Sequence, residues 1–174
     1  MPSGFAVLLA FVAFALPIAA EAQDATKVWR IGFLSAYSAD FDRSWRAAFR
    51  DGLRDLQYVE AKNTVIEQRH ADGRLERLPE LAAELVRSKI DVFVVHGHAQ
   101  AVRAAEQAGA ALPIVFIANP DPVGVGLVAS LARPGRRVTG LSDNHKELAG
   151  KRIELLKEAV PSLSRIAVLH ATAA

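Results

Sequence analysis

The stretch IDVFVVHGHAQA, from Ile90 to Ala101, decides the fold. Its four consecutive apolar residues, Val92 to Val95, are typical of a strand that is covered on both faces of a parallel sheet. A short loop, His96-Gly97-His98, separates this run from an alanine-rich segment that we expect to be helical from about Ala99. Ligands of such sheets bind at the carboxyl ends of the strands, where the first amides of the next helix favour anions and other acceptors. We therefore expect this loop to contact any ligand that the chain binds.

Strand-like and helix-like segments alternate on both sides of this stretch, and this alternation predicts an α/β fold with a doubly wound parallel sheet. The run at residues 64–69 is less apolar than the others, so we expect its strand near an edge of the sheet. Pro79 fits only the first turn of a helix, which places the start of the following helix near Arg77. The other predicted strands lie at residues 28–35, 113–118, 138–141 and 166–169, and the other predicted helices begin near residues 41, 99, 127 (a short helix, 127–131) and 147.

Composition excludes several classes of function. The 174 residues carry a formal charge of +2 that is spread along the chain without a basic block, so the sequence gives no support to nucleic-acid binding. Cysteine is absent, which excludes disulfides, thiolate metal sites and cysteine nucleophiles.

Residues 1–22 have the pattern of a secretory signal peptide. Phe5 to Ile18 is almost entirely apolar, and Ala20-Glu21-Ala22 offers small residues at the two positions that a signal peptidase reads. The apolar run is short for a membrane span. No Lys or Arg precedes this run, and the alternatives are a retained anchor or a misassigned start codon. The pattern predicts export and cleavage after Ala22.

The sequence contains no convincing catalytic or metal motif. His96 and His98 have a spacing that metal sites use, but a metal needs further ligands, and the spacing selects none of His70, His145, Asp121 and Asp143. Ser35 and Ser142 do not lie in G-x-S-x-G, and Gly124-Val125-Gly126 is only half of a dinucleotide fingerprint. We expect no cofactor and no enzymatic reaction.

Polar side chains do follow the predicted strands. Since the carboxyl ends of parallel strands meet at one edge of the sheet, we expect these side chains to surround one crevice and to bind a ligand. For each residue alone, the alternative is a role in a turn or a helix cap. The candidate ligand-binding residues are Ser35 and Tyr37 after the first strand, His98 after the third, Asp121 after the fourth and Asn144 after the fifth.

Several segments together resemble the periplasmic substrate-binding proteins of ABC transporters, in the family that includes aromatic amino-acid binders. The resemblance covers about residues 28–169, and DPVGVGLVASLARPG and AGKRIELLKE are its most specific parts. The segments are RIGFLS from Arg30, FRDGLRDLQYVEAKNTVIEQRHADGRLERLPELAAELVRSKIDV from Phe49, PIVFIANPDPVGVGLVASLARPG from Pro113, VTGLS from Val138 and ELAGKRIELLKEAVPSLSRIAVL from Glu147.

The resemblance implies a type I periplasmic-binding-protein fold, in which two lobes close over a small molecule and the closed form is recognised by a membrane permease. It implies a periplasmic location and an N-terminal lobe at residues 23–143. Residues 144–174 would be the crossover helix and first strand of an incomplete second lobe. We therefore expect a truncated or frameshifted member or a fragment that binds ligand weakly or not at all, with a tail that lacks proper partners after about Asp143.

Two departures from the family leave the identity of the ligand open. His96-Gly97-His98 stands where the family has small residues with Thr or Ser, and Arg136-Arg137 stands where Gly-Asn is usual. The alternative functions are a flavodoxin-like α/β enzyme and the effector-sensing domain of a regulator. The first lacks a catalytic constellation, and the second would need a DNA-binding helix-turn-helix that does not precede the first strand.

Overall fold

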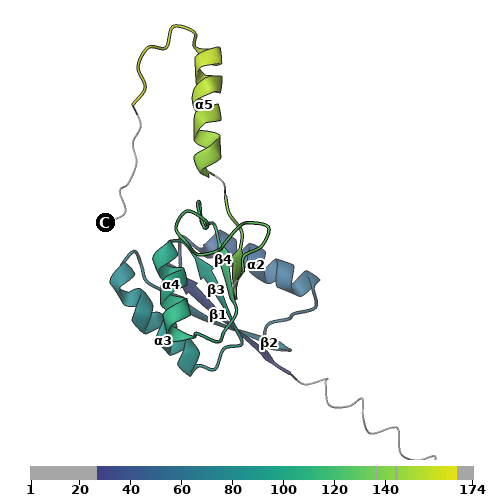
Figure 1. Ribbon diagram of the computed structural model, residues 1–174. Helices are drawn as coiled ribbons and strands as arrows, with labels where there is room; N and C mark the ends of the chain where they lie inside the picture. Colours follow the sequence, from purple (N-terminus) through teal and green to yellow (C-terminus); the bar gives the residue numbers. More distant parts are fainter. Residues whose placement is uncertain (1–26, 136, 144, 168–174) are drawn as a thin grey trace, which may run out of the picture.

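The computed structural model describes residues 27–135, 137–143 and 145–167, with side chains omitted at 145–147 (Figure 1). The predicted signal peptide and Asn144 therefore lie outside the described residues. The five strands form one parallel sheet in the order β2-β1-β3-β4-β5, which confirms the predicted fold class and places the least apolar strand at an edge. The strands are β1 (Trp29–Ser35), β2 (Thr64–His70), β3 (Val92–His96), β4 (Ile114–Ile117) and β5 (Val138–Gly140).

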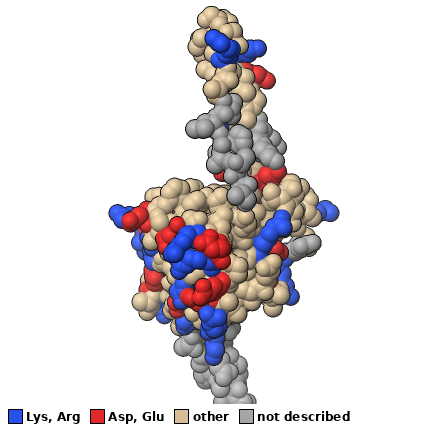
Figure 2. Space-filling view, turned by 90° about the vertical axis from the view of Figure 1, so that its left-hand side faces the viewer, with Lys and Arg blue, Asp and Glu red and all other residues tan. Residues whose placement is uncertain are grey.

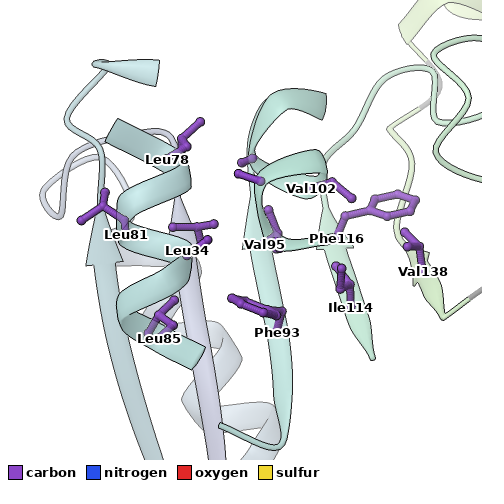
Figure 3. Packing of buried hydrophobic residues seen from close by; sticks show 14 of the residues in the cluster. Leu34, Leu78, Leu81, Leu85, Phe93, Val95, Val102, Ile114, Phe116 and Val138 are labelled. Carbon is purple, nitrogen blue, oxygen red and sulfur yellow. The ribbon is translucent and has the colours of Figure 1, made fainter. Parts of the chain in front are cut away.

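One face of the sheet is tightly sealed by two helices, α3 (Leu78–Arg87) and α4 (Ala99–Ala108), which lie side by side over it (Figure 1). A short 3-10 turn, η1 (Leu75–Arg77), leads into α3, and Pro79 occupies the first turn as predicted. Branched and aromatic side chains of the strands interdigitate with leucines of α3 and with small residues of α4. The core residues labelled in Figure 3 are Leu34, Leu78, Leu81, Leu85, Phe93, Val95, Val102, Ile114, Phe116 and Val138.

The other face carries a single helix, α2 (Arg43–Asp55), that is only partly buried. Phe49 and Leu53 pack against a small cluster that contains Phe33, but no residue of α2 itself is buried. Apolar side chains at either end of α2 are exposed, with Leu56 70% and Phe41 59% accessible. This face is therefore less well covered than the face under α3 and α4.

The charges of the surface are mixed in sign. On the face shown in Figure 2, Lys and Arg lie among Asp and Glu rather than in a block of one sign. The arginines of α2 form exposed ion pairs, such as Arg50 with Glu60 at 2.7 Å and Arg54 with Asp51 at 2.8 Å. Pairs of this kind contribute little to stability.

The helix predicted at residues 127–131 is wrong, because the segment after β4 folds as consecutive turns. The Leu127 amide donates to the Pro122 carbonyl at 2.8 Å, and Gly126 has a φ of 72°, which a helix does not allow. Leu127 and Val128 are nevertheless buried in the core below α4. The apolar residues of this segment are therefore buried by turns rather than by a helix.

The last helix, α5 (His145–Ala159), extends away from the body of the molecule (Figure 1). Its apolar side chains are exposed, among them Leu148 at 46% and Leu155 at 51%. The strand predicted at residues 166–169 is not formed at Ile166 and Ala167, and its remainder lies outside the described residues. A strand needs a hydrogen-bonded neighbour, and the sheet of the described residues ends at β2 and β5.

The helices of the described residues are all too short or too polar to span a membrane.

Candidate ligand-binding site

Three polar residues end neighbouring strands at the same level of the sheet. Ser35 at the end of β1 pairs in register with His70 of β2 on one side and with His96 of β3 on the other. Because side chains alternate along a strand, Ser35 points to the same face as Phe33, the face under α2. The carboxyl edge of the sheet therefore carries a polar row of two imidazoles and one hydroxyl, covered by the start of α2.

A carboxylate from the residue before α2 lies against this row. Asp42 is fully buried, and its Oδ1 is 2.8 Å from Nδ1 of His96, a hydrogen bond between side chains that are almost inaccessible. Its Oδ2 is 3.2 Å from Nδ1 of His70 but is not aligned for a hydrogen bond. Asp42 stands at the N-cap position of α2 without making a side-chain cap. Its carboxylate is thus directed at the imidazoles rather than at the helix amides.

Aromatic rings surround His96. The Tyr37 ring lies edge-on at 5.2 Å between centroids, and the Trp45 ring lies at the same distance in a tilted orientation. Phe41 contacts Tyr37 at 4.5 Å and lies stacked on His96 at 6.4 Å. Phe41 and Trp45 are 59% and 46% exposed. The edge of the sheet is therefore faced by aromatic rings that remain open to solvent.

Tyr37 is the residue that links the predicted site together. Its amide donates to Oγ of Ser35 at 3.0 Å, and its ring lies 5.8 Å from that of His98. Burial raises the pKa of the Tyr37 hydroxyl above its ordinary value, and the charges of Asp42 and Asp143 raise it further. The phenol therefore stays protonated and can donate a hydrogen bond at neutral pH.

The loop between β3 and α4 approaches Tyr37 closely. Gly97 has a φ of 106°, and a Cβ at this position would lie 2.9 Å from the Tyr37 ring, so glycine is required there. His98 is exposed and stands at the N-cap of α4 with an extended backbone and without a side-chain cap hydrogen bond. The first amides of α4 are consequently not capped by His98, which suits an acceptor group of a ligand.

The structure brings three of the five predicted residues, Ser35, Tyr37 and His98, into one cluster. Asp121 is partly buried in the turn after β4, where its Oδ1 accepts from the Gly124 amide at 2.9 Å. This contact has the turn role that was the alternative for Asp121. The position of Asn144 lies outside the described residues.

Sequence reasoning did not identify Asp42, His70, Phe41 or Trp45 as part of this edge. The parallel register of β2 with β1 would have placed His70 beside Ser35, but Asp42 before a helix reads as an ordinary cap. In the described part of the chain, no group of three or more His, Cys, Asp or Glu side chains is arranged to hold a metal ion.

Three hollows lie on parts of the surface other than the polar edge of the sheet. They are shallow and have volumes of about 200, 370 and 330 Å³; the first lies between α2 and the start of β2, the second at the starts of β4 and β5, and the third between α3 and α4. None of the three is lined by Ser35, Tyr37, His96 or His98. At the polar edge, Phe41, Trp45 and His98 are exposed to solvent.

Comparison with known proteins gives consistent matches. The profile of the family described as ABC transporter substrate binding protein matches residues 31–173. A curated relative, the tyrosine-binding protein of Clostridioides difficile, is 32% identical over 127 residues, which are 73% of this chain and 36% of the relative.

Solved structures agree in fold. A conserved domain protein from Vibrio cholerae matches with a TM-score of 0.68 and 32% identity over 78% of this chain and 45% of its own. A ligand-free, open substrate-binding protein with adhesive properties from Clostridium difficile matches with a TM-score of 0.64 and 26% identity over the same shares. An ABC domain in complex with L-Trp from Streptococcus pneumonia has a TM-score of 0.59 and 27% identity over 66% of this chain and 38% of its own. This chain thus spans roughly a third to a half of the length of these proteins.

Proposed function

Since this chain belongs to the ABC transporter substrate-binding protein family, we propose that it is part of the solute-binding component of an ABC uptake transporter. The match of the family profile over residues 31–173 is the observation that carries this proposal. The partners are then a small-molecule ligand and a membrane permease, and the chain catalyses no reaction on the ligand. We also propose export to the periplasm through cleavage of residues 1–22.

The ligand class that fits the carboxyl edge best is an α-amino acid. The amides at the start of α4 suit a carboxylate, the phenol of Tyr37 and the hydroxyl of Ser35 can exchange hydrogen bonds with polar groups, and exposed rings flank them. One relative is named for tyrosine binding and one related structure holds L-Trp, which supports the same class. We propose Ser35, Tyr37, His98, Asp121 and Asn144 as ligand contacts of this lobe.

We further propose that residues 23–143 form the first lobe and that residues 144–174 begin a second. The exposed apolar side chains of α5 support this division, because such side chains normally pack against another element. A ligand held between two lobes is buried on most of its surface, and one lobe offers about half of those contacts. A loss of about 4 kcal/mol would weaken binding roughly a thousandfold, which takes a two-lobed binder of about micromolar affinity to about millimolar affinity for this chain alone.

The binding proposal is tested by titrating the isotope-labelled chain with amino acids and, as a control, with neutral sugars, while amide resonances are followed. Amino acids should shift the resonances of Tyr37, His98 and the first turn of α4, and sugars should not. Shifts confined to residues outside the carboxyl edge would overturn the site. Micromolar affinity would overturn the argument that one lobe is insufficient.

The export proposal is tested by expressing the chain in a bacterium with a periplasm and sequencing the N-terminus of the periplasmic material. The sequence should begin at Gln23. A matched variant, Ala22→Arg, should block cleavage because the peptidase reads a small residue there. Intact Met1 in cytoplasmic material of the unaltered chain would contradict the proposal.

A further inference from the structure

The buried carboxylate of Asp42 is an unusual feature of the edge, because a buried charge is costly unless it is well paired. Within the described residues, its ion-pair partners are the imidazoles of His70 and His96, which are charged only when protonated. The nearby guanidinium of Arg46 is directed elsewhere and donates to Oε1 of Gln68 at 2.6 Å and to the carbonyl of Ala39 at 2.9 Å. Arg46 carries a positive charge of its own, but it contacts neutral acceptors, so while the imidazoles are neutral no cation forms an ion pair with Asp42 among the described residues.

This negative charge is felt at the aromatic rings. Burial raises the pKa of the Tyr37 hydroxyl most, and the charges of Asp42 and Asp143 raise it further, which is the response of an acid placed near negative charge. The same potential favours a positive group brought to the ring. Such a group need not reach the buried carboxylate itself, because its attraction acts through the weakly polarisable side chains between them.

The aromatic rings around His96 present a surface that a cation prefers. Phe41 and Trp45 are about half exposed, although they flank a polar site and large aromatic side chains are usually buried. The face of an aromatic ring attracts ammonium groups, and tryptophan does so most strongly. A buried carboxylate bonded to His96, with exposed aromatic rings around the same imidazole, is a combination that favours positive charge over neutral or negative groups.

We propose, resting on the solute-binding function above, that this edge recognises the ammonium group of the ligand through the rings of Tyr37, Phe41 and Trp45. Asp42 is a positioning residue: it accepts the Nδ1 proton of His96, holds the imidazole between the rings and supplies the negative charge beneath them. With a carboxylate directed to the start of α4, the edge orients a zwitterion, its ammonium toward α2 and its carboxylate toward α4.

The experiment compares three probes that share a phenylethyl skeleton and differ in the charged groups that they carry. L-Phenylalanine carries both charged groups, phenethylamine carries only the ammonium, and N-acetyl-L-phenylalanine carries only the carboxylate. Each is titrated into the full chain at about pH 8, above the ordinary titration range of imidazole, and amide shifts at α2 and α4 are recorded separately. Phenethylamine should shift the start of α2, N-acetyl-L-phenylalanine should shift the start of α4, and L-phenylalanine should shift both.

Variants separate the contributions. Asp42→Asn, which preserves shape, should weaken the amine about fivefold to tenfold and leave N-acetyl-L-phenylalanine unchanged. The matched control Asp51→Asn removes an exposed carboxylate of the same helix and should change neither. Should Asp42→Asn fail to fold, Trp45→Leu serves in its place, since it removes the ring from an exposed site and should weaken the amine about threefold or more.

Each outcome decides between the two proposals. The inference would be overturned if Asp42→Asn bound phenethylamine as tightly as the unaltered chain does. Where Asp42→Asn fails to fold, the same result for Trp45→Leu would overturn it. Binding of N-acetyl-L-phenylalanine without the amine would overturn it too and leave the solute-binding function standing. No response to any of the three probes, nor to other amino acids at their solubility limits, would overturn both for this chain.

Discussion

Replacing Asp42 by leucine tests whether the buried cluster is held together by its charge. The substitution removes the acceptor of the 2.8 Å hydrogen bond from Nδ1 of His96, and it removes the carboxylate that lies 3.2 Å from Nδ1 of His70. The buried Nδ1 of His96 is then left without its acceptor. Breaking a buried pair from one side costs about 3–5 kcal/mol. Loss of helix capping adds nothing, because Asp42 makes no side-chain cap. A domain of ordinary stability, about 5–15 kcal/mol, would remain measurably folded.

The second half of the experiment removes His96 as well. Replacing both members of a buried pair by apolar residues is often neutral or even stabilising, so Asp42→Leu with His96→Leu should recover most of the loss, to within about 1–2 kcal/mol of the unaltered chain. Urea unfolding is followed by the fluorescence of Trp45, whose ring lies 5.2 Å from that of His96. Asp51→Leu, an exposed change on the same helix, should stay within about 0.5 kcal/mol.

Two results would refute the reasoning. A cost below about 1 kcal/mol for Asp42→Leu would mean that the carboxylate is effectively solvated and that the imidazoles find other partners. A double variant no more stable than the single one would mean that Asp42 and His96 do not act as a pair, since a coupled pair must show an interaction energy in such a cycle.

Three further outcomes are expected. The Asp91 carboxylate accepts a hydrogen bond from the Arg30 amide at 2.8 Å, which lowers the pKa of Asp91. Asp91→Asn should therefore lower the free energy of unfolding by about 1 kcal/mol above about pH 4, and the loss should vanish as the pH falls through the lowered pKa. Urea unfolding at a series of pH values measures this. Gly140→Ala should cost about 1–3 kcal/mol, because its Cβ would meet the Phe116 carbonyl. Gly52→Ala, in open space within α2, should instead stabilise by about 0.5–1 kcal/mol, and comparable melting temperatures for the two variants would contradict this. Amides of α5 should exchange with solvent faster than those of α4, since its apolar side chains are exposed, and equal protection would show that α5 packs in solution.

The order of strands and helices could be predicted because each element carries its own period of apolar residues. The buried run at Val92 to Val95 and the first-turn Pro79 fixed their elements to within a residue. The backbone of the segment at 127–131 could not be predicted, since its apolar residues are buried by a turn whose shape depends on the positive φ of Gly126. A local apolar pattern indicates burial, but it does not distinguish a helix from successive turns.

The site was predictable only as far as parallel topology reaches. Ser35, Tyr37 and His98 follow strands whose ends meet, and they do lie together. The role of Asp42 depends on which way one side chain turns at the start of α2, toward its own amides or toward the sheet. The sequence favours a side chain that caps the helix amides. In the structure the side chain of Asp42 turns toward the sheet instead, because the imidazoles of β2 and β3 lie in register there. Long-range register of this kind is not written in any local pattern.

The two faces of the sheet are covered unequally, so the helices on them should unfold locally at different free-energy costs. The face under α3 and α4 is closed by fully buried leucines, whereas α2 is anchored by side chains that are only partly buried. Among the helices that pack on the sheet, α2 is therefore the one whose release costs least, and its release would carry Phe41, Asp42 and Trp45 away from the sheet. A ligand that contacts these residues clamps the helix as it binds. Occupancy should then be visible along the whole of α2, several turns from the bound molecule, as a slowing of its amide exchange.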